Sequence, residues 1–410
     1  MPTRLHAIGQ RSETVRRANL SAIVRELHLS GARTRSELVA RTGLTRSAIR
    51  DLIGEFVNAD LVTEQRAASL GGPGRPSPLV RPNPERAVVL AFDIAVDSVA
   101  VALVGFGGEM LDLGRVQRPR GRSSVAEVVD QLTRLAEPIL GRSRSDSPIG
   151  IGVAVAGIVR RSDGFVEMAP NLGWREVPLA GPLVGALHAS APISVANEAD
   201  LGALAELRRG VAIGAENVLY LSGEVGVGGG LIVDGRSLTG VAGFGGEVGH
   251  MPVNPDGIAC QCGSTGCWET EVGEEALLRL AGHQPGGGWS EVDAVIAEAR
   301  SGSAIALAAF DGVGRWLGLG LAGLINILNP RLVVLGGLFG RIHPLVARSL
   351  AEELDRRALP GSRALVRVVP ARLGVDAPLL GAAELAFEPF LANPAAWLRP
   401  REGRAEGATA

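Results

Sequence analysis

The chain has 410 residues, enough for two or three domains that each bury a core. Hydrophobic residues make up 46% and charged residues 20%, a composition typical of soluble globular proteins. Residues 1–19 are polar and Arg-rich, which argues against a secretory signal, and the uncharged apolar stretch 316–329 is too short to span a bilayer. We therefore expect a cytoplasmic protein with no membrane partner, and interpret residues 316–329 as a buried helix before a strand at 332–335.

The net charge of −2 is unevenly distributed along the chain. Residues 1–82 contain 13 arginines and 7 acidic residues, a net charge of +6, so the remainder carries −8. A basic head on an acidic body predicts that the head binds a polyanion. Six excess charges alone are also compatible with an ordinary solvated surface.

Three helices are predicted in the basic head. Apolar residues recur with a helical period over 14–28. Thr34 and Glu37 have the spacing of a capping box and open a second helix, and Gly43 stands where a tight turn needs a left-handed residue. Thr45 then caps a third helix with an apolar face made of Ile49, Leu52, Ile53, Phe56 and Val57.

Three helices with a glycine turn before the last predict a helix-turn-helix in residues 1–82. After it the chain becomes extended and reverses through a Gly- and Pro-rich segment at 71–76, which we interpret as a wing. Residues 81–84 (Arg-Pro-Asn-Pro) have the composition of a linker. The whole head is thus predicted to be a winged helix-turn-helix DNA-binding domain.

Four side chains of the head are candidate DNA contacts. Arg46, Ser47 and Arg50 lie away from the apolar seam of the third helix, where arginine can reach guanine and serine can bind phosphate or a base edge. Arg75, between Gly74 and Pro76, has the extended shape that fits a narrow minor groove. The alternatives are a solvated polar helix face and a plain turn with an exposed arginine.

Beyond the head, apolar strands alternate with helical stretches. Strands are predicted at 88–94, 98–104, 150–155 and 218–222, and helices at 125–139, 179–188 and 200–209. This alternation predicts an α/β protein over residues 83–395. The pattern alone does not distinguish a two-lobed fold from a Rossmann arrangement. Residues 396–410 form a tail, polar after Pro400, that we expect to be disordered.

All three cysteines of the chain lie in one short segment after a histidine, and the candidate ligands are His250, Cys260, Cys262 and Cys267. One imidazole and three thiolates form a closed four-coordinate set, which predicts a structural zinc. Gly263 and Gly266 allow the tight turns that convergence of three thiolates needs. Three buried free cysteines are the alternative, and a disulfide would leave an odd cysteine over.

The same segment carries a family resemblance. Residues 245–251 (GGEVGHM), followed by Cys-x-Cys-Gly-x-x-Gly-Cys-x-Glu, resemble the signature of the ROK family, a group of repressors and sugar kinases. Further stretches that resemble family segments are 155–159 with 169–174, 197–200, and 326–330 with 336–337. The resemblance extends from about residue 87 to about residue 387. It implies the two-lobed ribonuclease-H-like, or actin-like, sugar-kinase fold with a sugar in the cleft between the lobes.

The resemblance assigns sugar binding to Asn197, Glu198, Glu247, His250 and Glu269. A zinc bound through one nitrogen of His250 would fix the tautomer and leave the other nitrogen for a sugar hydroxyl. The family's catalytic aspartate corresponds to Glu198, whose extra methylene moves the carboxylate. A displacement of about 1 Å already costs about 100-fold in rate. We therefore expect no catalytic residue, only Glu198 at the position of the altered base.

Both phosphate loops differ from those of the family's kinases. The kinases carry Asp-x-Gly-Gly-Thr at the first strand, whereas residues 93–97 read Asp-Ile-Ala-Val-Asp. Ala95 and Val96 fill space that close approach of ATP needs, and Asp97 adds a carboxylate. In the second loop Glu224 adds another anion, and like charges near a polyphosphate cost several kcal/mol in a partly desolvated site. These differences predict that ATP chemistry is lost.

We therefore predict a sugar-responsive DNA-binding transcriptional regulator, most simply a repressor, whose kinase-derived body is a sensor and not an enzyme. One recognition helix reads few base pairs, so a homodimer or homotetramer on palindromic operator DNA is expected. The alternative is an active ATP-dependent sugar kinase with an appended DNA-binding domain. A zinc-stabilised interaction module that binds neither ATP nor sugar is a third possibility.

Overall fold

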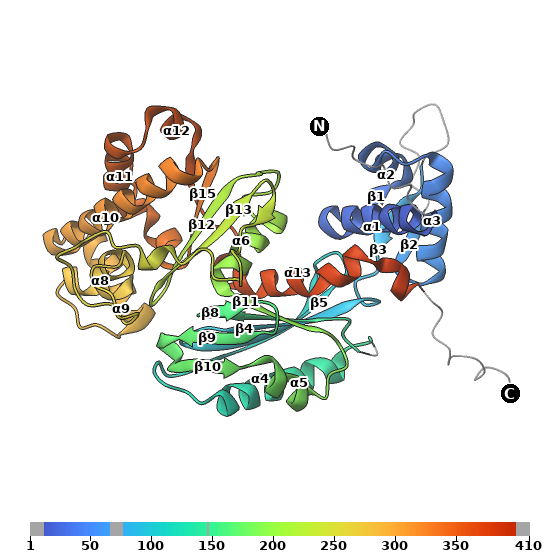
Figure 1. Ribbon diagram of the computed structural model, residues 1–410, viewed down its shortest axis with the longest axis horizontal. Helices are drawn as coiled ribbons and strands as arrows, with labels where there is room; N and C mark the ends of the chain where they lie inside the picture. Colours follow the sequence, from blue (N-terminus) through green and yellow to red (C-terminus); the bar gives the residue numbers. More distant parts are fainter. Residues whose placement is uncertain (1–11, 66–76, 146, 399–410) are drawn as a thin grey trace, which may run out of the picture.

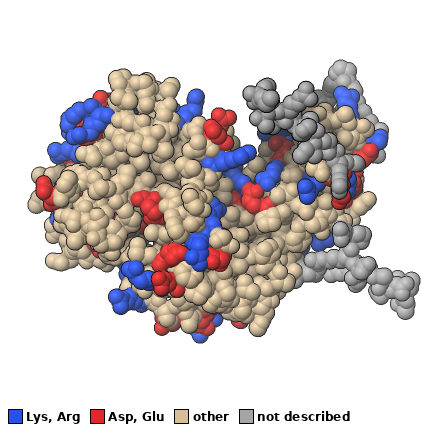
Figure 2. Space-filling view, viewed as in Figure 1, with Lys and Arg blue, Asp and Glu red and all other residues tan. Residues whose placement is uncertain are grey.

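The computed structural model describes residues 12–65, 77–145 and 147–398. They form a small N-terminal head and a larger body of two lobes (Figure 1). The long helix α13 (Ala377–Ala392) runs from the body toward the head and packs against both. Figure 2 shows acidic and basic side chains interspersed over this face of the body.

The head is a three-helix unit with a small antiparallel sheet. Its elements are α1 (Ser12–Ser30), β1 (Arg33–Thr34), α2 (Arg35–Thr42), α3 (Arg46–Asn58), β2 (Val62–Gln65) and β3 (Leu79–Pro82), with strand order β1-β3-β2. The Thr34 hydroxyl accepts from the Glu37 amide at 3.2 Å, and the Glu37 carboxylate accepts from the Thr34 amide at 2.7 Å. Gly43 has φ = 70°, and Thr45 caps α3. The predicted capping box, left-handed turn and third helix are confirmed.

Three details of the predicted head differ from the structure. Val57 is 39% exposed, so the apolar face of α3 ends at Phe56, one residue earlier than predicted. Arg81 and Pro82 pair with Thr63 and Val62 in the sheet, and they are therefore not part of a linker. The predicted wing at 71–76 lies outside the described residues.

The first lobe is built on a five-stranded sheet with helices on both faces. Its strands are β4 (Val88–Ile94), β5 (Ser98–Gly105), β6 (Met110–Gln117), β7 (Ile151–Val155) and β11 (Ile193–Asn197), in the order β11-β7-β4-β5-β6. Helix α4 (Val125–Arg142) and α5 (Ala180–Leu187) cover one face, and α13 covers the other (Figure 1). Burial on both faces explains why β4 and β5 are almost entirely apolar, with Asp93 and Ser98 as their buried polar residues.

A second, smaller sheet of the first lobe consists of β8 (Ile158–Arg160), β9 (Phe165–Ala169) and β10 (Trp174–Pro178). A short 3-10 turn, η1 (Pro170–Leu172), joins β9 to β10. Helix α6 (Glu198–Arg209) follows β11 and passes between the lobes to pack on α13.

The second lobe repeats the topology of the first. Its strands are β12 (Val218–Gly223), β13 (Val227–Val233), β14 (Arg236–Ser237), β15 (Leu332–Gly336) and β16 (Arg367–Pro370), in the order β14-β13-β12-β15-β16. In each lobe an antiparallel three-strand meander is followed by two parallel strands on the other side of the first strand. This duplication is what distinguishes the two-lobed sugar-kinase fold from a Rossmann arrangement.

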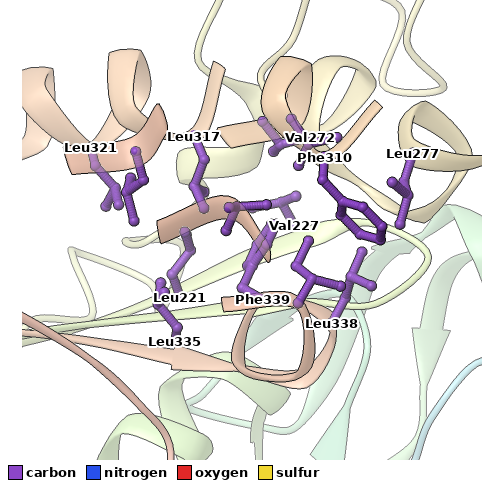
Figure 3. Packing of buried hydrophobic residues seen from close by; sticks show 14 of the residues in the cluster. Leu221, Val227, Val272, Leu277, Phe310, Leu317, Leu321, Leu335, Leu338 and Phe339 are labelled. Atoms are coloured by element: carbon purple, nitrogen blue, oxygen red, sulfur yellow. The ribbon is translucent and has the colours of Figure 1, made fainter. Parts of the chain in front are cut away.

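Helices pack on the second sheet to form the largest core of the protein (Figure 3). They are η2 (Val248–His250), α7 (Glu269–Val272), α8 (Glu274–Leu280), α9 (Gly288–Arg300), α10 (Ala304–Leu328), α11 (Gly337–Arg357) and α12 (Pro360–Leu365). Leu317 and Leu321 of α10 lie over Leu221 and Leu335 of the sheet, and Phe310 of the same helix lies beside Leu277 and Leu338.

Helix α10 is the one helix in the described ranges with the length and composition of a membrane span. It packs against α11, α8 and α9 within the lobe, which confirms the predicted core helix before a strand. The helix begins at Ala304 and not near residue 316, because Asp311 and Arg315 interrupt the apolar sequence without interrupting the helix.

The apolar core of the head is continuous with that of the body. Leu20, Ile23 and Leu27 of α1 belong to one continuous apolar cluster with Phe387 and Phe390 of α13. The turn η4 (Pro394–Trp397) extends this contact, because the Trp397 ring lies 6.3 Å from that of Phe390. Residues 396–398 are thus ordered and not a tail, and 399–410 lie outside the described residues.

Candidate functional site

A cavity of about 150 Å³ lies between the two lobes. Its lining includes all five side chains predicted to bind sugar, which are Asn197, Glu198, Glu247, His250 and Glu269. Asn171, Glu224 and Arg279 also line it and were not assigned to sugar binding from the sequence. Polar side chains from both lobes therefore converge on one partly enclosed space, as a polyhydroxylated ligand requires.

Asn197 organises the floor of this cavity. Its Oδ1 accepts from the amides of Ala199 at 2.7 Å and Asp200 at 3.4 Å, and so caps the N-terminus of α6. Its Nδ2 donates to the Gly157 carbonyl at 2.9 Å. The side-chain NH₂ group has two N–H donors. One of them, together with Oδ1, holds the loop after β7 against α6, and the second remains for a ligand.

The acidic side chains of the cleft are strongly desolvated. Burial, followed by repulsion from Glu224, raises the pKa of Glu198 well above its ordinary value. Burial also raises the pKa of Glu224 to about 8 and that of Asp93 to about 7. The surroundings of Glu224 therefore favour its neutral form more than an exposed glutamate would experience.

Asp97, the other predicted anion, is held in an ion-pair network that joins the lobes. Arg120 places Nη2 3.1 Å from the Asp97 carboxylate, and its two terminal nitrogens lie 2.6 and 2.9 Å from the Glu274 carboxylate. Glu274 begins α8 of the second lobe and is buried. Arg120 thus pairs with Asp97 but is shared with Glu274, so the three side chains together keep a net charge of −1. Sequence offered no signal for this bridge, because its members are far apart in the chain.

The predicted metal ligands converge. The ligand atoms of His250, Cys260, Cys262 and Cys267 all lie within 4.8 Å of one another. His250 Nδ1 is 3.7 Å from Cys260 Sγ, and Cys262 Sγ is 3.7 Å from Cys267 Sγ. Ligands about 2.0–2.3 Å from a tetrahedral zinc are separated by distances of about this size. The donor set therefore fits a four-coordinate zinc.

Glycine is required at both predicted turns of this loop. Gly263 has φ = 96° and Gly266 has φ = 66°. A Cβ on Gly266 would lie 1.6 Å from the Asn254 carbonyl oxygen, so no side chain fits there.

The cysteine loop is connected both to the cleft and to the core. The Glu269 Oε1 lies 3.5 Å from His250 Nδ1 and 2.8 Å from Cys260 Sγ. Trp268, fully buried, donates from Nε1 to the Trp316 carbonyl of α10 at 2.9 Å. Sequence reasoning missed Trp268, although a large aromatic residue beside the last cysteine was a signal for such an anchor. The loop thus fixes the cleft carboxylates relative to the second lobe.

The helix-turn-helix side chains lie as predicted on one exposed end of α3. Arg46, Ser47 and Arg50 are exposed, and the Arg50 Nε donates to the Asp51 carboxylate at 2.9 Å. Ser47 Oγ lies 3.1 Å from the Thr45 hydroxyl at the helix N-terminus. Arg75, the predicted minor-groove contact, lies outside the described residues.

These features define a class of protein. The duplicated lobes and the polar cleft between them are typical of sugar kinases, and the head has the helix-turn-helix architecture that is typical of DNA-binding domains. Residues 89–388 match the description of the ROK family, and the chain belongs to this family. It is 30% identical to the xylose repressor of Bacillus spizizenii, over 92% of this chain and 97% of the repressor. It is also 30% identical to a glucokinase of Halalkalibacterium halodurans, over 71% of this chain and 92% of the kinase.

Among solved structures, too, a regulator covers more of this chain than a kinase does. A ROK family transcriptional regulator, described as a homologue of the E. coli MLC protein, superposes with a TM-score of 0.74 at 24% identity and covers 94% of this chain and 97% of that regulator. A ROK family glucokinase from Streptomyces griseus, in complex with glucose and AMPPNP, gives 0.64 at 28% identity and covers 73% and 99%. Residues 83–410 are 80% of the chain, so the matches to the regulators must include part of the head, whereas the matches to the kinases are no longer than the body.

Proposed function

We propose that this protein is a sugar-responsive transcriptional regulator, most simply a repressor. The main support is the extent of the similarity. Regulators match more than 90% of this chain, which must include part of the helix-turn-helix head, whereas kinases match 71–73%, which is no more than the length of the body. The head binds operator DNA and the cleft of the body binds a sugar. A DNA partner implies a cytoplasmic protein, and a palindromic operator implies a homodimer or homotetramer.

The test is an operator-binding titration with and without sugar. An operator is first selected from random DNA duplexes with the purified protein. Pentoses and hexoses, beginning with D-xylose and D-glucose, are then screened for a rise in the thermal midpoint. A sugar that raises this midpoint and changes operator affinity supports the proposal. A protein that selects no DNA sequence contradicts it.

We further propose that zinc occupies the His250–Cys260–Cys262–Cys267 cluster as a structural ion. The support is the close grouping of four suitable ligand atoms and the two glycine turns that permit it. Bound zinc would supply no reaction chemistry, because its four protein ligands leave no open position. It would hold Glu269 and His250 at the cleft.

Loss of kinase activity is the second functional prediction. Val96 lines the cavity where the family's kinases have glycine, and Arg120 bridges Asp97 to Glu274 across the cleft. We expect no phosphorylated product from ATP and any sugar that the protein binds, and no effect of ATP on operator affinity. Product formation in a coupled assay for ADP, confirmed by mass spectrometry of the sugar, would replace the sensor with the kinase alternative.

Arg46→Ala and Arg50→Ala are each expected to weaken operator binding by about 1–3 kcal/mol, because both side chains project from the exposed end of α3. Arg134, an exposed arginine of α4 in the body, supplies the matched control, and Arg134→Ala should bind like the parent. Fluorescence anisotropy at one fixed salt concentration measures all three. Unchanged affinity in both head variants would remove α3 as the recognition helix.

The DNA contacts proposed from the sequence also include Ser47 and Arg75. Arg75→Ala should weaken binding chiefly at A·T-rich sites, as expected for a minor-groove contact. Ser47 is placed to bind a phosphate oxygen or a base edge beside Arg46.

A further inference from the structure

Helix α6 has one end in the cleft and the other at the head. Its N-terminal residues, Asn197 and Glu198, line the cavity between the lobes. Its C-terminal residues, Arg208 and Arg209, lie beside α1 of the head. At about 1.5 Å per residue, twelve residues span about 18 Å. The helix is therefore long enough to connect the two sites directly.

Close packing prevents α6 from sliding past its neighbours. A Cβ on Gly381 of α13 would lie 1.9 Å from the Leu201 carbonyl oxygen of α6. On the opposite side, a Cβ on Gly230 of β13 would lie 2.4 Å from the Ala199 carbonyl oxygen. Backbones this close leave no space to absorb a displacement, so movement at one end of α6 is passed on to α13 and to the other end.

At the C-terminal end, a buried polar group joins α6, α13 and α1, and we name it the junction cluster: His28, Arg208, Arg209 and Glu384. Arg208 donates to Glu384 at 3.1 Å, and Arg209 pairs with the same carboxylate. Nε2 of His28 is 3.2 Å from both oxygens of Glu384. The Glu384 carboxylate of α13 is thus bonded both to α6 of the body and to α1 of the head.

The surroundings of His28 fix its orientation. The Gly107 amide donates to His28 Nδ1 at 3.1 Å, and Nε2 of the ring faces both the Glu384 carboxylate at 3.2 Å and Nη2 of Arg209 at 2.8 Å. The ring is fully buried between Phe106 and Phe387. Arg209 also donates to the carbonyl oxygens of Gly107 at 3.0 Å and His28 at 3.3 Å. The ring nitrogens of His28 and the Arg209 guanidinium thus contact groups from other elements, and these contacts fix the geometry of the joint.

We propose that α6 and the junction cluster form the mechanical connection through which ligand binding in the cleft repositions the DNA-binding head. The inference rests on the proposed sugar-responsive function and adds the residues that carry the coupling. His28, Arg208, Arg209 and Glu384 are positioning residues: they touch neither sugar nor DNA. Ligand contact with Asn197 and Glu198 displaces α6, and Glu384 and His28 transmit the displacement to α1.

The test is His28→Leu in the full chain, which removes the bond to Glu384 without altering the cleft or α3. Sugar affinity, measured by calorimetry with whichever of D-xylose and D-glucose binds the parent, should stay within about twofold. Sugar-induced change in operator affinity, typically about 5- to 150-fold, should fall below about twofold. His28→Gln, whose amide can still donate to Glu384, should recover part of the response. His343→Leu on α11 is the matched control and should respond fully.

A full response in folded His28→Leu protein would overturn the proposal. If His28→Leu does not fold, Arg209→Lys takes its place, because lysine keeps the charge but cannot bridge Glu384 and the Gly107 carbonyl together. The same loss of response is expected, and a full response again overturns the proposal.

A ligand-free measurement separates this inference from the proposed function. If neither sugar alters operator binding by the parent, the proposed function fails and the connection is judged by hydrogen exchange. Asn197→Ala removes the cap of α6, and we expect faster amide exchange in the last turn of α1, which contains His28. Unchanged exchange in that turn would show that α6 does not connect the cleft to the head.

Discussion

Cys262→Ser is expected to release the metal and to destabilise the second lobe by several kcal/mol. Apparent binding free energies of structural zinc are about 10–16 kcal/mol in small zinc domains, and much of this is folding free energy. Cys262 is only partly buried, so exchange of sulfur for oxygen has little effect on packing by itself. The destabilisation would therefore report loss of the metal, transmitted through Trp268 to the core of the lobe.

Metal content by mass spectrometry and the thermal midpoint by calorimetry measure this effect. Ser264→Ala changes an exposed residue of the same loop that is not a ligand, and it should retain one zinc and the parent midpoint. Parent protein purified without chelator that holds no zinc, or Cys262→Ser protein that keeps a full equivalent, would contradict the assignment.

Features set by neighbouring residues were predictable from the sequence. The capping box of Thr34 and Glu37 and the cysteine loop depend on contacts within a few residues, and both were predicted correctly. Strand β4 was predicted with its observed bounds. A strand that is buried on both faces has a nearly continuous apolar sequence, and that sequence marked its ends. Structure that depends on contacts between nearby residues can therefore be predicted from a short stretch of sequence.

Features made by distant residues were not predictable in this way. His28 and Glu384 are 356 positions apart, and each looked like an ordinary helix residue. Arg120 and Glu274 are separated by 154 positions, so the sequence did not show that an arginine links Asp97 to the second lobe. The head also appeared self-sufficient, because the pattern of α1 records that one face is buried but not that Phe387 and Phe390 cover part of it.

Removal of the Glu247 carboxylate from the cleft is expected to have the second large effect, a loss of sugar affinity. Glu247 lies on the loop before η2 and lines the cavity beside His250. Burial raises its pKa, while the neighbouring His250 opposes this rise. A partly desolvated carboxylate that accepts from a sugar hydroxyl forms a charge-assisted bond, which contributes about 1.5–3 kcal/mol. Its removal therefore lowers sugar affinity about 10- to 100-fold.

Glu247→Ala is accordingly expected to abolish the response to sugar at concentrations that saturate the parent, with operator affinity in the absence of sugar unchanged. The DNA contacts are on α3 of the head, and Glu247 has no contact with the junction cluster. Glu216→Ala, at an exposed glutamate of the same lobe, is the matched control and should respond like the parent. The measurements are sugar titration by calorimetry and operator binding by anisotropy at several sugar concentrations. A Glu247→Ala protein that responds at the parent's sugar concentration would place the effector outside this cleft, because Glu247 lines the cavity beside His250.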